Sequence, residues 1–212
     1  METKRFDIIT EADARRLEPG STVRLAPRGH VTPLAADTLR ERRVTVIAED
    51  GRGAPAAADL APRADIRTIA IGSDHVGFEL KGHLIGVLRG RGLAVHDVGV
   101  LEKSPADYPD IAAAVGRQVA RHEADAGVVI DGAGLGSAIA ANKIRGIRAA
   151  MCVNETLARY SREHNGANVL TLGATLVTAE EAVAIVTRFL ETPMREARYI
   201  ARLEKIARLE QN

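Results

Sequence analysis

Beyond residue 67 the chain alternates short apolar runs with longer amphipathic segments. The apolar runs have the length of buried strands and cover residues 68–71, 94–98, 127–130, 147–151 and 169–172. The amphipathic segments have helical spacing and cover residues 78–89, 111–121, 137–143, 155–164, 180–190 and 195–209. Because strand and helix alternate, we predict an α/β fold with a parallel five-stranded sheet sandwiched by helices.

The first fifty residues repeat this alternation on a smaller scale. Strands are predicted near residues 6–9, 22–25 and 44–48, and helices from Thr10 and near residues 33–42. The stretch that follows is rich in Gly, Pro and Ala and lacks periodicity, as is typical of a linker. We therefore predict a small N-terminal α/β appendage at residues 1–50, a linker at 51–66 and the main domain at 67–212. Fifty residues bury only a marginal core, so the appendage is expected to lean on the rest of the protein or on a partner.

Composition narrows the classes of partner. The net charge of +1, the aromatic content of 3% and the absence of Trp argue against nucleic-acid binding. No run approaches the roughly 20 apolar residues of a membrane span, and the N-terminus lacks a signal-peptide core, so we expect a cytoplasmic protein without a membrane partner. The single cysteine, Cys152, lies in an apolar run and is interpreted as a small buried hydrophobe.

In parallel α/β sheets, ligands bind beyond the carboxyl ends of the strands, so the loops at those ends are the candidate binding sites. The loop after residues 68–71 contains Asp74 and His75, a pair suited to act as acid, base or anion contact. The alternative is structural, with Asp74 as a helix N-cap and His75 as a polar first-turn residue.

The loop after residues 127–130 combines one acid with three alternating glycines, Asp131, Gly132, Gly134 and Gly136. Amides of residues 132–136 can approach an oxyanion closely because glycine carries no side chain. The spacing fails both the dinucleotide fingerprint G-x-G-x-x-G and the Walker pattern. An acid beside such donors is better suited to proton transfer than to phosphate binding, so Asp131 is the candidate base. The alternative is that Asp131 simply caps the next helix.

Two further groups lie toward the C-terminus. His164 and Asn165 stand at a predicted helix end, where a structural histidine is the alternative interpretation. Arg195, Arg198 and Arg202 fall within two turns of the last predicted helix, and Arg198 and Arg202 share one face. Paired guanidiniums can hold a phosphate, although a solvated basic face is the commoner outcome.

Together these motifs resemble the ribose-5-phosphate isomerase B family, which also contains galactose-6-phosphate isomerase subunits and allose-6-phosphate isomerases. The resemblance spans about residues 68–209 and rests on ordered motifs at family spacing, which are residues 72–81, 107–110, 132–136 with 139–143, and 161–165 with 167–170. It implies a Rossmann-like fold and an aldose–ketose isomerase of a phosphorylated sugar, ribose 5-phosphate by default. The reaction would proceed through a cis-enediolate after ring opening, without metal or cofactor.

The resemblance also implies roles for individual residues. His164 would open the sugar ring, Asp74 and Asn165 would contact hydroxyls, and His75, Arg198 and Arg202 would hold the phosphate. The amides of Gly132 to Gly136 would stabilise the enediolate oxygen, with Ser137 among the substrate-binding residues. The family builds its sites across a homodimer interface, so His164 and Asn165 would serve the neighbouring subunit of a dimer or a dimer of dimers.

Several departures from the family pattern put the substrate in question. Many members carry a Cys base where this chain has Asp131, and another branch uses Glu at Ser137, which cannot serve as a base here. Asp131 then inherits the role. Ala133, Thr175 and Tyr199 replace a common threonine, arginine and histidine. Two alternatives to a ribose-5-phosphate isomerase follow. The protein could be an isomerase of another pentose or hexose phosphate, or a non-catalytic sugar-phosphate-binding or scaffold protein. A nucleotide-dependent oxidoreductase is disfavoured by the glycine spacing.

The N-terminal appendage lies outside that resemblance. Residues 9–13, 34–37 and 42–44 are similar to short segments found on enzymes associated with bacterial microcompartments. This similarity implies that residues 1–50 recruit the enzyme to a microcompartment shell or to other cargo.

Overall fold

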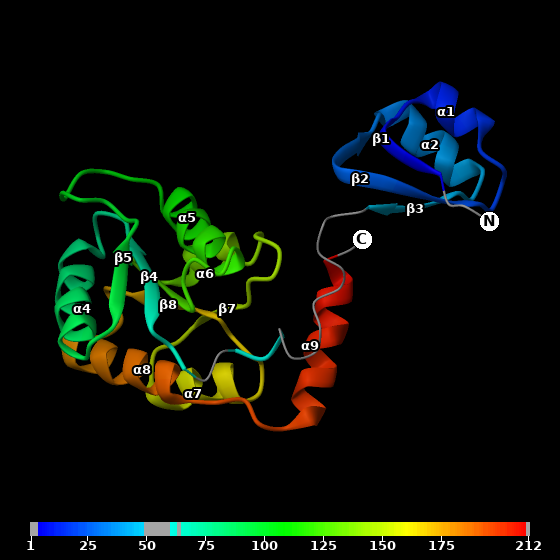
Figure 1. Ribbon diagram of the computed structural model, residues 1–212. Coiled ribbons are helices and arrows are strands. Elements are labelled where there is room, and N and C mark those ends of the chain that lie inside the picture. Colours follow the sequence, from blue (N-terminus) through cyan, green and yellow to red (C-terminus); the bar gives the residue numbers. More distant parts are fainter. Residues whose placement is uncertain (1–3, 49–59, 63–64, 211–212) are drawn as a thin grey trace. The chain divides into compact units, whose positions relative to one another are not determined.

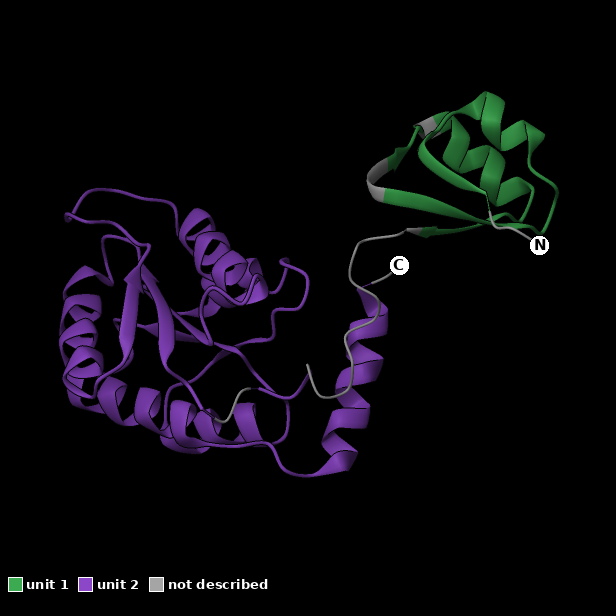
Figure 2. Ribbon diagram, viewed as in Figure 1, with its two compact units in different colours: residues 1–56 green, residues 57–212 purple. Residues whose placement is uncertain are grey.

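The structure is a computed structural model that describes residues 4–48, 60–62 and 65–210. It divides into two compact units, residues 1–56 and residues 57–212 (Figure 2). The division falls within the predicted linker at 51–66, most of which lies outside the described residues. Each unit is described by itself.

The larger unit is built on one parallel sheet of five strands. The strands are β4 (Thr68–Ser73), β5 (Ala94–Asp97), β6 (Ala126–Asp131), β7 (Ala149–Met151) and β8 (Val169–Gly173). Their order is β5-β4-β6-β8-β7, and every neighbouring pair is parallel. The predicted five-stranded parallel sheet is confirmed.

Helices cover both faces of this sheet (Figure 1). They are α4 (Phe78–Gly90), α5 (Tyr108–Ala120), α6 (Leu135–Ala141), α7 (Glu155–Glu163), α8 (Ala179–Glu191) and α9 (Ala197–Leu209). Ile130 and Leu172 pack with α4, α7 and α8 on one face, and Val129 packs with α5 and α6 on the other. This explains why the central strands read as continuous apolar runs.

The last helix begins later than predicted. Thr192, after α8, has an extended backbone and is followed by Pro193, which cannot continue a helix. Glu196 is also extended, so α9 begins at Ala197 and Arg195 precedes it. The prediction that Arg195 shares the last helix with Arg198 and Arg202 is therefore wrong.

The smaller unit has three parallel strands in the order β1-β2-β3. Its elements are β1 (Arg5–Ile9), α1 (Glu11–Arg16), β2 (Thr22–Val31), α2 (Pro33–Glu41) and β3 (Thr45–Ala48). Thr10 caps α1 by accepting a hydrogen bond from the Asp13 amide, as its sequence position suggests. Ile9, Val23 and Leu39 are buried in a hydrophobic core within this unit. In the described part of the chain, no helix is long and apolar enough to cross a membrane.

Candidate active site

Two predicted site loops meet at the carboxyl edge of the large sheet. Strands β4 and β6 are neighbours, with Ser73 opposite Ile130, and the Asp74 amide donates to the Ile130 carbonyl at 3.2 Å. The Asp74–His75 loop and the glycine loop therefore lie side by side, as parallel pairing requires. We call Asp74, His75, Asp131, Gly132 to Gly136 and Ser137 the carboxyl-edge cluster.

The carboxylate of Asp131 is turned into its own loop. Its Oδ1 accepts hydrogen bonds from the Ala133 amide at 2.8 Å and from the Gly134 amide. Its Oδ2 accepts from the Ser137 amide at 3.0 Å and from the Ser137 hydroxyl. Asp131 is 5% exposed, so these four donors take the place of water. The amides of Ala133, Gly134 and Ser137 and the Ser137 hydroxyl are thus engaged by Asp131, which matches the contacts of a capping residue.

The glycines of this loop permit close packing. Gly134 has φ +75°, and a Cβ there would lie 2.9 Å from the Leu172 carbonyl carbon. At Gly136 a Cβ would lie 2.5 Å from Cζ of Tyr108, whose ring covers the loop. Sequence reasoning gave Tyr108 no role, although it stands in the motif at residues 107–110 that supports the family resemblance. Thr175, one of the departures, donates its hydroxyl to the Gly132 carbonyl at 2.7 Å and so reinforces the loop.

Two polar atoms, one at the end of β4 and one in the loop after it, lack a hydrogen-bond partner among the described residues. Oδ1 of Asp74 accepts from the amides of Val76 at 2.9 Å and Gly77 at 3.0 Å, so Asp74 closes the turn before α4, and Gly77 is the N-cap. Nδ1 of His75 and Oγ of Ser73 are buried and make no hydrogen bond to the described residues. A buried polar atom of this kind is a place where a ligand or a water can bind.

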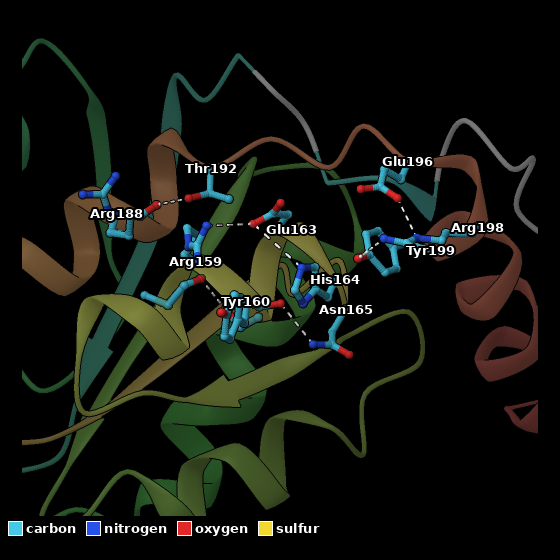
Figure 3. A network of polar contacts seen from close by, with 12 residues as sticks. Arg159, Tyr160, Glu163, His164, Asn165, Arg188, Thr192, Glu196, Arg198 and Tyr199 are labelled. Atoms are coloured by element: carbon cyan, nitrogen blue, oxygen red, sulfur yellow. Dashed lines mark hydrogen bonds and ion pairs between the residues drawn. The ribbon is translucent and has the colours of Figure 1, made fainter.

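The other predicted residues form a second group, of which Figure 3 shows His164, Asn165 and Arg198. The His164 ring lies between the rings of Tyr160 and Tyr199, with centroids 4.7 Å and 4.8 Å away. Asn165 donates its side-chain amide to the Tyr160 carbonyl at 3.0 Å. We call these residues the aromatic cluster, which comprises Tyr160, His164, Asn165, Arg198, Tyr199 and Arg202. Sequence reasoning missed Tyr160, although it precedes His164 by four residues and so shares its helix face.

Two arginines, the fully buried Arg162 and the partly buried Arg148, hold the loop that carries His164 and Asn165. Arg162 donates from Nη1 to the Ala167 carbonyl at 2.9 Å, and Arg148 donates from Nε to the Gly166 carbonyl at 2.7 Å. Burial, with a smaller contribution from Arg148, lowers the pKa of Arg162 to about 10. The Arg162 guanidinium therefore remains charged near neutral pH, and both arginines fix the backbone after α7.

The two clusters lie at opposite ends of the strands, one at the carboxyl ends and the other at the amino ends. Asp131, at the carboxyl end of β6, pairs with Gly173 at the carboxyl end of β8, whereas Gly127 pairs with Val169 at the other end. His164 stands between α7 and the amino end of β8. Four residues of strand separate the two ends by about 13 Å. A single chain therefore does not bring Asp131 and His164 together.

Comparison with known proteins assigns the chain to a family. The sequence model of a family described as Ribose/Galactose Isomerase matches residues 69–206. The chain belongs to the ribose/galactose isomerase family. It is 42% identical over 146 residues to ribose-5-phosphate isomerase B of Escherichia coli, covering 69% of this chain and 98% of that protein.

Solved structures of ribose-5-phosphate isomerase B agree with this fold. The Clostridium thermocellum protein shares 45% identity and a TM-score of 0.66, covering 68% of this chain and 97% of the other. The Mycoplasma genitalium protein, solved with bound ribulose 5-phosphate, shares 37% identity and a TM-score of 0.66 over the same fractions. The chain is therefore an aldose–ketose isomerase, and the predicted family is confirmed. The family match begins at residue 69, so the microcompartment resemblance of the N-terminal unit stays a prediction.

The single cysteine, Cys152, does not have the properties of the cysteine base that many family members carry at position 131. Cys152 is buried, as predicted, and burial raises the pKa of its thiol to about 11. A thiol of that pKa carries little thiolate at neutral pH, so Cys152 is not a substitute base. Among the described residues, no group of three or more His, Cys, Asp or Glu side chains is arranged to hold a metal ion.

Proposed function

We propose that this isomerase interconverts ribose 5-phosphate and ribulose 5-phosphate. The relatives named above carry this activity in their names, and one of them was solved with ribulose 5-phosphate. The observation that carries the proposal is the carboxyl-edge cluster, where Asp131 and a glycine loop lie beside Asp74 and His75. That combination offers a base, amide donors and polar contacts for a sugar phosphate.

In the proposed reaction, Asp131 removes the C2 proton of the open-chain aldose and returns a proton to C1, while a proton passes from the C2 hydroxyl to the C1 oxygen. The cis-enediolate formed between these steps carries negative charge on the C1 and C2 oxygens. The amides of Leu135 and Gly136 lie in the first turn of α6, where an amide has no intrahelical partner, and they would stabilise that charge. His75 Nδ1 would take a substrate contact, and no metal or cofactor takes part in the proposed steps.

The four hydrogen bonds at Asp131 set a condition on this role. A base needs a lone pair that faces the substrate, and a carboxylate has about four lone-pair sites. The proposal therefore requires the sugar to displace at least one donor, most simply the Ser137 hydroxyl, which can rotate.

Substitution at Asp131 tests the base. We expect Asp131→Asn to lower kcat by at least about a hundredfold and to abolish solvent deuterium entry at C1 of ribulose 5-phosphate. We expect Asp131→Cys to recover part of the rate as the pH rises toward the usual thiol pKa of about 8.5, because a thiolate can replace the base. An Asn variant that folds and turns over normally would refute the assignment.

The same four hydrogen bonds favour a second candidate function, sugar-phosphate binding without turnover. A carboxylate fully engaged by its own loop acts as a structural element. Incubation of the purified protein with ribose 5-phosphate and EDTA separates the candidates, because the isomerase forms ribulose 5-phosphate and the binding protein does not. A panel of pentose and hexose phosphates in the same assay tests the alternative substrates.

We further propose that each site is shared by two copies of the chain. One copy would supply the carboxyl-edge cluster, and its partner would supply His164 and Asn165 as ring-opening and hydroxyl contacts, with Arg198 and Arg202 for the phosphate. Support comes from the separation of the clusters within one chain and from exposed apolar side chains on α6, α7 and the β7–α7 loop. These are Leu135, Ile139, Val153, Leu157 and Tyr160. Such a surface suits an interface between copies.

Mixing two inactive variants tests the shared site. A hybrid of Asp131→Asn and His164→Gln chains contains one site with both native residues and one site with neither. Random exchange makes half of the dimers hybrid, so the mixture should recover about a quarter of the native activity. A site formed within one chain would recover none.

The N-terminal unit completes the proposal. We propose that residues 1–50 recruit this cytoplasmic enzyme to a microcompartment shell or to other cargo, on the strength of the short resemblances described above. The separate core of this unit is consistent with an accessory role.

A further inference from the structure

His164 is held on both sides by aromatic rings (Figure 3). The Tyr160 ring is nearly parallel to the imidazole, at 18°, and the Tyr199 ring is tilted by 36°. Tyr160 belongs to α7 and Tyr199 to α9, so the imidazole is clamped between two helices distant in sequence. The Glu163 carboxylate lies 3.9 Å from His164 Nε2 at the edge of this stack.

Tyr199 also contacts both arginines proposed to bind phosphate. Its hydroxyl accepts a hydrogen bond from Nη2 of Arg198 at 3.0 Å. The guanidinium carbons of Arg198 and Arg202 lie 4.8 Å and 5.6 Å from its ring centroid, within cation–π range. One side chain therefore touches the proposed ring-opening residue and both proposed phosphate ligands.

Tyr199 is itself firmly placed, whereas the arginine that it contacts is not. Tyr199 is 7% exposed, and Leu203, one turn along α9, is buried where a Cβ at Gly166 would lie 2.6 Å away. The Arg198 side chain is 64% exposed and also pairs with Glu196, which is the main cause of its raised pKa. An exposed arginine has many rotamers to lose on binding a phosphate, so a fixed neighbour that restricts it should improve binding.

We propose that Tyr199 is a positioning residue that couples the phosphate-binding arginines to the ring-opening histidine. The Tyr199 ring sets the plane of the His164 imidazole, and the Tyr199 hydroxyl sets the direction of the Arg198 guanidinium. The phosphate and the sugar ring of the substrate are therefore bound in fixed positions relative to each other. This coupling rests on the proposed function for the roles of His164 and Arg198. It also gives a reason for Tyr199, one of the departures from the family pattern.

Two substitutions separate the hydroxyl from the ring. Tyr199→Phe removes only the acceptor for Arg198, so KM for ribose 5-phosphate should rise about three- to tenfold while kcat stays within about twofold. Tyr199→Leu also removes the stacking face, so kcat should fall by about tenfold or more as His164 loses its orientation. Tyr160→Phe is the matched comparison, because it removes the hydroxyl from the ring on the other face of His164, which does not contact Arg198 in the described residues; it should raise KM by less than Tyr199→Phe does.

Affinity for inorganic phosphate, measured by calorimetry, provides a readout that does not depend on turnover. Tyr199→Phe should weaken phosphate binding by the same factor as it raises KM, with an unchanged unfolding midpoint. If the native protein binds phosphate but shows no isomerase activity, the proposed function fails while the effect of Tyr199→Phe on phosphate still tests the coupling to Arg198. If Tyr199→Phe leaves both KM and phosphate affinity unchanged, the coupling is wrong. This variant decides the question even if Tyr199→Leu does not fold.

Discussion

The carboxyl-edge cluster and the aromatic cluster hold their functional groups in different ways. In the first cluster the backbone positions the functional group, because three amides, together with one hydroxyl, donate hydrogen bonds to Asp131. The glycines there let strands and loops approach closely. In the second cluster side chains position the functional groups. Two tyrosine rings pack on either side of His164, and the guanidiniums of Arg198 and Arg202 lie within cation–π range of the Tyr199 ring. The first cluster should therefore be sensitive to added atoms, and the second to lost ones.

The difference suits the chemistry proposed for each group. Stabilising an enediolate requires fixed dipoles that do not reorganise when charge appears, and a closed backbone loop provides them. Opening a sugar ring and gripping a phosphate require groups that reach out to a substrate, and partly exposed side chains on helix ends do so. Substitutions in each cluster test whether this difference holds.

The largest effect is expected from adding a methyl group to the glycine loop. Gly134→Ala forces a left-handed residue and places a Cβ against backbone atoms of Leu172 and Gly173, which cannot move aside. We expect a loss of about 2–4 kcal/mol in the free energy of unfolding, together with loss of activity. Denaturant unfolding and steady-state kinetics measure the two effects.

Two other glycines serve as graded controls. Gly166, in the loop of the aromatic cluster, has φ +59° and would meet the flexible end of Leu203, so Gly166→Ala should cost less than Gly134→Ala. Gly146 has φ +80° and nothing within 4 Å of a new Cβ, so Gly146→Ala isolates the backbone cost of about 1 kcal/mol. An equal cost at all three positions would show that close packing does not distinguish the clusters.

A smaller effect is expected from removing a donor to Asp131. Ser137→Ala deletes the hydroxyl that hydrogen-bonds Oδ2, so it should lower the free energy of unfolding by about 1–3 kcal/mol, as for bonds to charged groups. Ser73→Ala is the matched control, because Ser73 is equally buried but its hydroxyl makes no hydrogen bond to the described residues. Urea unfolding should find Ser73→Ala neutral or slightly stabilising, and a cost equal to that of Ser137→Ala would contradict this account.

In the aromatic cluster, the expected effect is on activity more than on stability. Tyr160 is partly exposed, so Tyr160→Leu should change the free energy of unfolding by less than about 1 kcal/mol. Loss of the parallel ring should lower kcat by about tenfold, because His164 gains rotational freedom. A variant that loses stability but keeps its kcat would reverse the contrast between the clusters.

Much of this could be read from the sequence because the periodicity reports burial directly. All six residues of β6 are buried, and they read as a continuous apolar run ending in Asp131, whose place at a strand end was predictable. In β2 the exposed Thr22 and Arg24 alternate with the buried Val23 and Leu25, as in a strand with one solvated face. The start of α9 was missed because charges at helical spacing continue through Arg195, whereas Pro193 and the extended backbone at Glu196 delay the helix.

The contacts within the site were harder to predict. An acid before a glycine loop suggested a base facing an oxyanion site, but the loop closes around the acid because its own amides are the nearest donors. Tyr199 carried no spacing signal toward His164, since the two come from different helices and meet only through packing. Such tertiary contacts lie beyond local patterns.

The smallest effect on catalysis is expected from removing the N-terminal unit. The described residues of this unit have a hydrophobic core of their own, made by Ile9, Val23, Leu39 and their neighbours, and the residues proposed for catalysis and binding all come from the larger unit. Deleting residues 1–56 should therefore leave kcat and KM within about twofold of the full chain, while any assembly that the unit recruits, measured by co-sedimentation, should be lost. A truncated chain that aggregates or loses its cooperative unfolding would mean that the unit stabilises the isomerase. That result would remove the separation on which its role in recruitment depends.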